Sequence, residues 1–253
     1  MIVCKSPAEI EKMRAASGLV AEVLAELAGM VAPGVSTQDL DIEAERLVRA
    51  AGAEPAFKGY RGYPCTLCAS TNDEVIHGIP SRRPLVEGDI VSLDMGVKQH
   101  GFFGDSAVTV PVGGVSEQAQ LLLKVTQESL EKGISQVRLG GRVSDIGHAI
   151  QQHVEAHGFS IVREFVGHGI GASLHEDPQI ANYGEPGRGP RLAEGMTLAI
   201  EPMVNVGRPG VKMMADGWTA VTRDGSLSAH FEHTVAVSKN GPVVLTRAAA
   251  RVR

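Results

Sequence analysis

The chain has 253 residues, of which 43% are hydrophobic, and a formal charge of −5 at pH 7. This length and apolar content suffice to bury the core of one large domain or two small ones. The negative charge argues against a nucleic-acid-binding surface covering the whole protein, because such a surface would be basic.

Two pairs of helices are predicted, one in each half of the chain. The first helix begins with Ser6-Pro7-Ala8-Glu9, which combines a serine N-cap, a proline in the first turn and a capping-box glutamate. Apolar residues then recur at helical spacing, and Gly133 is expected to end the third helix. The expected helices span residues 6–29, 37–52, 116–132 and 144–158.

The two helical pairs are similar in sequence. Laying residues 31–52 over residues 137–158 without a gap gives six identities in 22 positions, two of them glycines at loop and cap positions. This similarity predicts two halves related by an approximate two-fold axis, with helices outside and strands inside. The expected arrangement is a single domain, residues 1–253, with pseudo-repeats at about 1–112 and 113–247.

Strands are expected after each helical pair. The last of them follows Asn240-Gly241, a strong hairpin signal, and the tail at 248–253 is expected to fray. The expected strands span residues 66–70, 90–97, 102–110, 161–166, 196–206, 218–222, 228–238 and 242–246.

The strands at 90–97 and 102–110 predict half of a metal site. They flank a polar turn at 98–101, and each carries one aspartate within apolar sequence. If the hairpin is symmetric about Gln99-His100, Asp94 and Asp105 face each other directly. Opposed like charges destabilise an antiparallel pair and buried carboxylates are costly, so this pairing requires a cation between the strands.

The second half supplies three further candidate ligands, His168 in VGHGIG, Glu201 in MTLAIEPMV and Glu232 in SAHFEHTVAV. Taken singly, such residues are more often edge-exposed acids or hydrogen-bonded core histidines. Together with the two aspartates they give four carboxylates and one imidazole. That mixture suits two divalent ions with open coordination positions better than a closed structural zinc.

Other motifs fit poorly. Residues 167–172 match a loose dinucleotide-binding fingerprint, but Pro178 makes the required helix doubtful. The sequence has no P-loop and no H-E-x-x-H. Cys65 and Cys68 form a single C-x-x-C, which is too little for a zinc cage and does not favour a redox role.

The cellular compartment is predicted from the N-terminus and the cysteines. No signal peptide is visible, and no stretch approaches the roughly 20 apolar residues that span a bilayer. The three cysteines, Cys4, Cys65 and Cys68, are too few for a disulfide framework. We therefore expect a cytoplasmic protein that does not contact membranes.

The five candidate ligands occur within more specific signatures. Their order, together with GHGIG…HEDP, FEHT and YRGYPCTLCASTNDEVIHGIP, closely resembles the bacterial type I methionine aminopeptidases, subfamily A of peptidase family M24, over nearly the whole chain. The resemblance implies a duplicated α+β "pita-bread" fold, with a curved antiparallel sheet and helices outside. It also implies a hydrolase that removes the initiator methionine from nascent proteins with a small second residue. Apart from the resemblance, we expect a monomer, and transient contact with the ribosome is a further hypothesis.

The resemblance assigns roles to the candidate ligands position by position. Asp94 resembles the bidentate ligand of one metal, and His168 resembles the imidazole ligand. Asp105 and Glu232 resemble the ligands that bridge both metals. Glu201 resembles a ligand that also shuttles a proton. The two ions, of cobalt, manganese, iron or zinc, would acidify a bridging water to a hydroxide that attacks the first peptide bond.

The resemblance also implies substrate contacts. His77 matches the histidine that contacts the scissile amide nitrogen, and His175 the one that stabilises the tetrahedral intermediate. The methionine pocket would be lined by Tyr60, Tyr63, Cys68 and Trp218. Asn72 and Ser228 match a structural site for sodium or potassium. Leu174 replaces an aromatic residue and Phe57 a smaller one, which affects the shape of the pocket and leaves the chemistry unchanged.

Three alternatives are distinguishable. Prolidase-like and Xaa-Pro aminopeptidases share the five ligands but usually carry a further N-terminal domain, for which a first helix at Ser6 leaves no room. Type II methionine enzymes have a helical insertion, and none is evident between His175 and Glu201. A metal-free module that binds peptide or RNA would have lost ligands, whereas all five are present.

Overall fold

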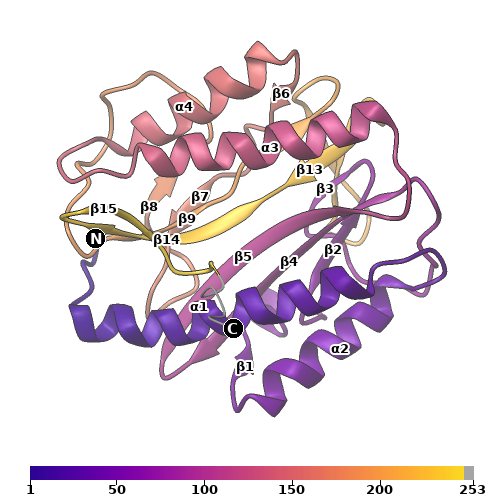
Figure 1. Ribbon diagram of the computed structural model, residues 1–253, viewed down its shortest axis with the longest axis horizontal. Helices are drawn as coiled ribbons and strands as arrows, with labels where there is room; N and C mark the ends of the chain where they lie inside the picture. The colour runs from indigo at the N-terminus through magenta and orange to yellow at the C-terminus, as the bar shows by residue number, and fades with distance from the viewer. Residues whose placement is uncertain (248–253) are drawn as a thin grey trace, which may run out of the picture.

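A computed structural model describes residues 1–247 and places two helical pairs on either side of a layer of strands (Figure 1). The predicted tail at 248–253 lies outside the described residues. None of the described helices has the length and apolar content needed to cross a membrane. The helices are α1 (Pro7–Met30), α2 (Thr37–Ala50), α3 (Glu117–Ser135) and α4 (Val143–Ala156).

The predicted helix starts agree with the structure to within one residue. At α1, the Ser6 side chain accepts a hydrogen bond from the Glu9 backbone, and the Ser6 backbone N–H donates to Glu9 Oε2 over 2.7 Å. The prediction for Gly133 was wrong, because α3 continues past it. A Cβ at Gly133 would lie 2.8 Å from two side-chain carbons of Ile150 in α4. This glycine therefore allows α3 and α4 to pack closely.

The strands form one large sheet and two small ones. The large sheet has the order β1-β4-β5-β14-β9-β7-β8, with β2 on β4 and β15 on β14. Its strands are β1 (Glu54–Pro55), β2 (Cys68–Thr71), β4 (Ile90–Gln99), β5 (Phe102–Pro111), β7 (Gly167–Gly169), β8 (Glu176–Ile180), β9 (Thr197–Ile200), β14 (Glu232–Ser238) and β15 (Gly241–Val244). The small sheets are β13 (Ser228–His230), β10 (Met203–Asn205) and β6 (Ser160–Ile161), and β11 (Val211–Met213), β12 (Ala220–Thr222) and β3 (Glu74–Ile76).

Two predicted strands are each divided between sheets. The run at 196–206 is interrupted at Glu201-Pro202, where β9 of the large sheet ends and β10 of a small sheet follows. The run at 228–238 is interrupted at Phe231, between β13 and β14. Proline cannot donate to a ladder, which explains the first interruption. Both interruptions adjoin a candidate ligand.

The predicted register of the β4–β5 hairpin was wrong by two residues. Asp94 pairs with Ala107, and Asp105 pairs with Gly96. The turn is the two-residue His100-Gly101, in which both residues have positive φ, 52° and 81°. That geometry matches the twist of the flanking strands, so the strands extend further than a four-residue turn would allow. The two aspartates are diagonal neighbours on one face, where like charges still lie close together.

The β5–β14 pair joins the two halves of the large sheet. Only two residue pairs are in register there, Glu232 with Ala107 and His233 with Ser106. Side-chain hydroxyls add to this short ladder: Ser106 Oγ donates to the Glu232 carbonyl over 2.6 Å, and Thr234 Oγ1 donates to the Asp105 carbonyl over 2.8 Å. Two of the candidate ligands therefore lie on the strands that connect the halves.

Each helical pair covers its own part of the core. Buried residues of α1 and α2 pack with β4 residues such as Leu93, whereas those of α3 and α4 pack with β9 and β14 residues such as Leu198. This arrangement is consistent with two halves that meet near residue 112, between β5 and α3. The repeat boundaries themselves remain a prediction.

The contact between α1 and β5 yields a stability prediction. A Cβ at Gly104 would lie 2.6–2.7 Å from the backbone and hydroxyl of Ser17, so Gly104→Ala forces β5 away from α1. We expect the free energy of unfolding to fall by about 1–3 kcal/mol in urea denaturation, the usual cost of overpacking. Gly18→Ala is the control, because nothing lies within 4 Å of its Cβ and alanine favours a helix. Equal stability of the two variants would contradict the close contact.

Candidate metal centre

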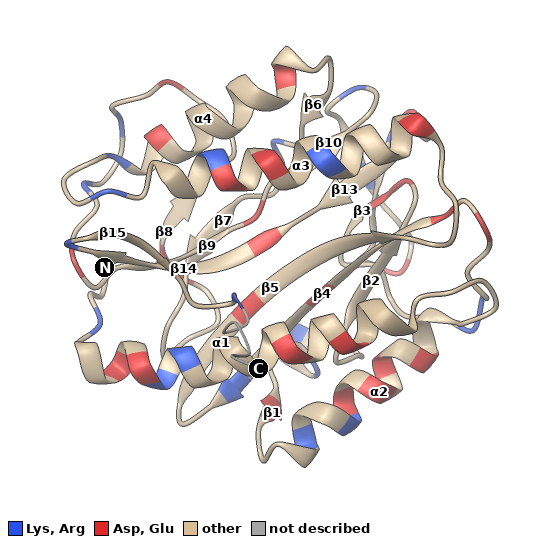
Figure 2. Cartoon of the chain, viewed as in Figure 1, with Lys and Arg blue, Asp and Glu red and all other residues tan. Residues whose placement is uncertain are grey.

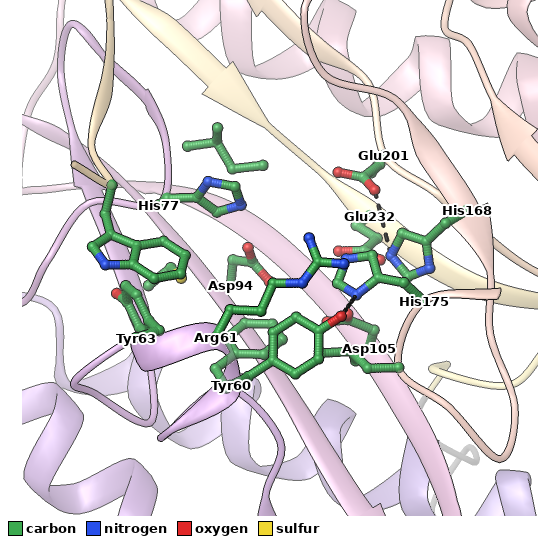
Figure 3. Close-up of a pocket in the computed structure, with 15 residues that line it drawn as sticks. Tyr60, Arg61, Tyr63, His77, Asp94, Asp105, His168, His175, Glu201 and Glu232 are labelled. Carbon is green, nitrogen blue, oxygen red and sulfur yellow. Dashed lines mark hydrogen bonds and ion pairs between the residues drawn. The ribbon is translucent and has the colours of Figure 1, made fainter. Parts of the chain in front are cut away.

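The five predicted ligands converge on one pocket (Figure 3). They come from β4, β5, β7, the end of β9 and the start of β14, and acidic positions within β5 and β14 lie between the two helical layers (Figure 2). The ligating atoms of Asp105, His168 and Glu232 lie within 4.8 Å of one another, and His168 Nε2 lies 3.6 Å from Glu201 Oε1. The fractional exposures are 6% for Asp94, 3% for Asp105, 7% for His168, 6% for Glu201 and 2% for Glu232.

The carboxylates lack compensating partners. Within residues 1–247, Asp94 Oδ1, Asp105 Oδ1 and Glu232 Oε1 are buried without a hydrogen bond. Burial raises the pKa of all four carboxyl groups, that of Asp105 to about 7, and neighbouring carboxyls raise the pKa of Asp94, Glu201 and Glu232 further. Such a cluster is stable only if it takes up protons or binds cations. The donor set therefore fits divalent metal ions.

His168 is held in the form that a metal requires. Its Nδ1 donates a hydrogen bond to the Gly169 carbonyl over 2.8 Å, which leaves the Nε2 lone pair directed toward Glu201. Burial, and then the charge of His175, lower the pKa of His168 to about 4, so the ring is neutral at pH 7. A neutral imidazole whose other nitrogen is anchored is a typical metal ligand.

Two further histidines border the cluster. His175 lies beside His168, with ring centroids 4.2 Å apart, and its Nδ1 is 3.0 Å from the Tyr60 hydroxyl (Figure 3). Burial is the main cause of a lowered pKa at His175. His77, directly after β3, has a φ of 61° and packs against Phe165, with ring centroids 5.6 Å apart. Burial lowers the pKa of His77 to about 4, so this ring is also neutral at pH 7.

The predicted methionine-binding residues lie in the same pocket. Tyr63 and Trp218 pack edge to face at 5.1 Å, and the Tyr63 hydroxyl lies 3.0 Å from the Gly78 carbonyl, which fixes its ring. Tyr60 and Cys68 also line the pocket, as do both of the departures noted in the sequence, Phe57 and Leu174. An apolar, aromatic recess thus adjoins the carboxylate cluster.

The sequence matches known proteins along almost its whole length. The sequence pattern of metallopeptidase family M24 covers residues 11–239. The chain belongs to metallopeptidase family M24. It is 53% identical over 247 residues to methionine aminopeptidase 1 of Bacillus subtilis (98% of this chain, 100% of that one). It is also 53% identical over 247 residues to the methionine aminopeptidase of Clostridium acetobutylicum (97% and 99%).

Solved structures confirm the expected M24 fold. The crystal structure of a methionine aminopeptidase from Thermotoga maritima superposes with a TM-score of 0.96 at 48% identity, covering 98% of this chain and 100% of that chain. A prolidase from Pyrococcus furiosus, at 21% identity, superposes with a TM-score of 0.79 over 98% of this chain and 66% of its own. The second likeness shows that the fold is shared within M24 and does not indicate a substrate.

The predicted monovalent-cation residues are brought together through the backbone. The Ser228 N–H donates to the Asn72 carbonyl over 2.8 Å. The side chain of Asn72 is engaged elsewhere, because Oδ1 accepts from Ile90 and Nδ2 donates to Asp89. The Asn72 side chain would therefore not bind the cation, and the site remains a prediction.

Two residues of the site were not predicted. His230 is 1% exposed, and its Nε2 lies 3.8 Å from Glu201 Oε2. Its spacing of two from Glu232 places both on one face of an extended chain, a signal that could have revealed it. Arg61 lines the pocket with a φ of 49°, and its guanidinium lies 5.3 Å from the Tyr60 ring centroid. Its sequence context carried no comparable signal.

Proposed function

We propose that this protein is a metal-dependent aminopeptidase that removes an N-terminal methionine when the second residue is small. The observation that carries the proposal is the meeting, in one pocket, of a buried carboxylate–imidazole cluster with the aromatic recess of Tyr63 and Trp218. The identity of about half of all residues to methionine aminopeptidases over the full chain supports the same activity.

Asp94, Asp105, His168, Glu201 and Glu232 would hold two divalent ions. When bound, such ions lower the pKa of a coordinated water and polarise a carbonyl oxygen. Oxygen-rich sites with one imidazole accept manganese, iron, cobalt or zinc, and availability selects among them. The unpartnered oxygens of Asp94, Asp105 and Glu232 are the atoms that a cation would compensate.

Three residues of the chain act on protons and developing charge. Glu201 takes a proton from the attacking water and passes it to the leaving amine. His175 donates a hydrogen bond to the carbonyl oxygen as negative charge develops there. His77 contacts the scissile amide nitrogen from the opposite side of the pocket.

The recess selects the first residue of the substrate. A thioether is polarizable and makes favourable contacts with aromatic edges and sulfur, which Tyr63, Trp218 and Cys68 provide. Binding of the free α-amino group beside the metal centre would confine the protein to chain ends. Phe57 and Leu174 border the recess and shape its mouth.

Nascent polypeptides are the proposed partners of this protein. We propose that it acts as a monomer and contacts the ribosome transiently. All three cysteines are free thiols, which suits a reducing compartment such as the cytoplasm.

A peptide panel tests the activity. On protein loaded separately with manganese, iron, cobalt or zinc, we expect kcat/KM for Met-Gly peptides to exceed that for Met-Lys peptides by about 100-fold or more, because a long second side chain does not fit. Xaa-Pro peptides are the control for prolidase-like activity. Chelation should abolish turnover. Preferred cleavage of Xaa-Pro, or turnover that survives chelation, would refute the proposal.

A further inference from the structure

Lys5 is a buried cation next to the catalytic pocket. Its side chain is 4% exposed, and Nζ donates to Glu176 Oε2 over 2.5 Å and to the Val3 carbonyl over 3.0 Å. Lysine is rarely buried unless it is paired, and here its partner Glu176 is itself largely buried, with 14% of its side chain exposed. An ion pair of this kind holds its two segments at a fixed separation.

Glu176 follows His175 directly, and its carboxylate spans the turn that carries this histidine. Oε1 accepts a hydrogen bond from the Ser173 N–H over 3.1 Å, while Oε2 binds Lys5. The turn also passes close above the ion pair. A Cβ at Gly171 would lie 2.2 Å from Lys5 Cε and 2.7 Å from Glu176 Oε1. The backbone on both sides of His175 is therefore tied to Lys5.

Lys5 itself is held by the large sheet. Its N–H donates to the Gly195 carbonyl over 2.7 Å, two residues before β9 begins. On the other side of the turn, the Phe103 N–H of β5 donates to the Gly171 carbonyl over 2.8 Å. The turn at 171–176 is thus fixed between β5 and the N-terminal segment. That segment leads into α1 and passes the end of the sheet where β8 and β15 lie (Figure 1).

We propose that Lys5 is a positioning residue for His175, acting through Glu176. The other restraints on the His175 ring are the stacked ring of Tyr60, with centroids 5.3 Å apart, the Tyr60 hydroxyl at Nδ1 and the neighbouring ring of His168. Without the Lys5 cation, the Glu176 carboxylate loses its buried partner and turns toward water, and the turn shifts with it. The imidazole then no longer meets the carbonyl oxygen of the substrate. This inference rests on the role given to His175 in the proposed function.

The kinetic test is a double-mutant cycle on full-length, manganese-loaded protein. Lys5→Met should lower kcat for a Met-Gly peptide about 10- to 100-fold with little change in KM, as expected for a displacement of about 1 Å. In a His175→Ala background the same substitution should cause no further loss. Losses that multiply in that background would overturn the proposal, because Lys5 would then act by another route.

Two further variants define the comparison. Lys239→Met is the matched control, because Lys239 pairs with Glu194 at 3.5 Å on the surface, with 73% of its side chain exposed, and its loss should leave kcat unchanged. Glu176→Gln removes the negative partner of the Lys5–Glu176 pair. It replaces Lys5→Met in the cycle if the Lys5→Met protein does not fold. The manganese stoichiometry should be equal in all of them, and a lost ion would contradict a positioning role.

A measurement that needs no turnover separates this inference from the proposed function. In ¹⁵N-labelled protein, the imidazole resonances of His175 should shift in Lys5→Met and stay unshifted in Lys239→Met, with those of His148 as an internal reference. Unshifted His175 resonances in Lys5→Met would overturn the inference. Absence of Met-Gly cleavage by the wild-type protein would instead refute the proposed function.

Discussion

Asp94→Asn should abolish nearly all turnover while making the metal-free protein more stable. The amide keeps the shape of the side chain but has no negative charge to balance a cation. We therefore expect kcat to fall by more than about 100-fold, which exceeds the loss typical of mutating a residue that only hydrogen-bonds to a metal ligand. Calorimetric titration should show weaker manganese binding with fewer equivalents. Retained activity with full metal content would exclude Asp94 as a ligand.

Asp94→Asn should stabilise the metal-free protein although it abolishes turnover, because the buried carboxylate itself lowers stability. Burial and the nearby Asp105 raise the pKa of Asp94 in the folded state, so ionising it costs stability once the pH exceeds its ordinary value of about 3.9. That cost is present at pH 7 and absent at lower pH. With chelator at pH 7, the Tm of Asp94→Asn should therefore exceed that of the wild type, and the difference should vanish on acidification.

Asp89→Asn is the matched control. Asp89 is as buried as Asp94, at 6% exposure, but its oxygens accept hydrogen bonds from Asn72 Nδ2 and the Val86 N–H. Its substitution should lower the Tm and leave the metal stoichiometry unchanged. A metal-free Asp94→Asn protein that is less stable than the wild type would show that Asp94 is a structural acid like Asp89.

His175→Ala should lower kcat by about 100- to 1,000-fold with the metal content unchanged, the range for removal of one donor to a developing oxyanion. KM should change little, because this hydrogen bond strengthens only in the transition state. Steady-state kinetics on a Met-Gly peptide and metal analysis of the same sample check both statements. An effect confined to metal content would assign His175 to the ligands.

His148→Ala is the control for the loss of an imidazole. His148 is half-buried on α4, with Nδ1 bonded to the Gly184 carbonyl over 3.0 Å, and it does not line the catalytic pocket. It should retain full turnover. A comparable fall of kcat in both variants would point to a general disturbance of the fold.

Local signals predicted what depends on local geometry. The capping residues Ser6 and Glu9 placed the start of α1 correctly, because a cap acts within one turn. The hairpin register escaped prediction, since it depended on whether the turn had two residues or four. Gly133 was misread for a related reason: a glycine that ends a helix and one that admits a neighbouring helix look alike in sequence.

The sequence predicted which residues make up the candidate metal centre, but not how the strands bring these residues together. Acids and histidines within apolar strands identified Asp94, Asp105 and the three later residues, and the structure brings all five together. How they meet depended on strand interruptions at Glu201-Pro202 and Phe231, which a continuous apolar run conceals. The environment of His175 depended on Lys5, which is 170 residues away and lies in an N-terminal segment without a motif.

The short ladder between β5 and β14 links the stability of this protein to the supply of metal. Only two residue pairs are in register between these strands, and the buried carboxyls of Asp105 and Glu232, one on each strand, must take up protons or bind a cation. A ligand that binds only the folded state adds about 1.4 kcal/mol for each tenfold rise in its concentration above Kd. A metal bound there would therefore also stabilise the contact between β5 and β14, and we expect the Tm of the protein to rise with the metal concentration.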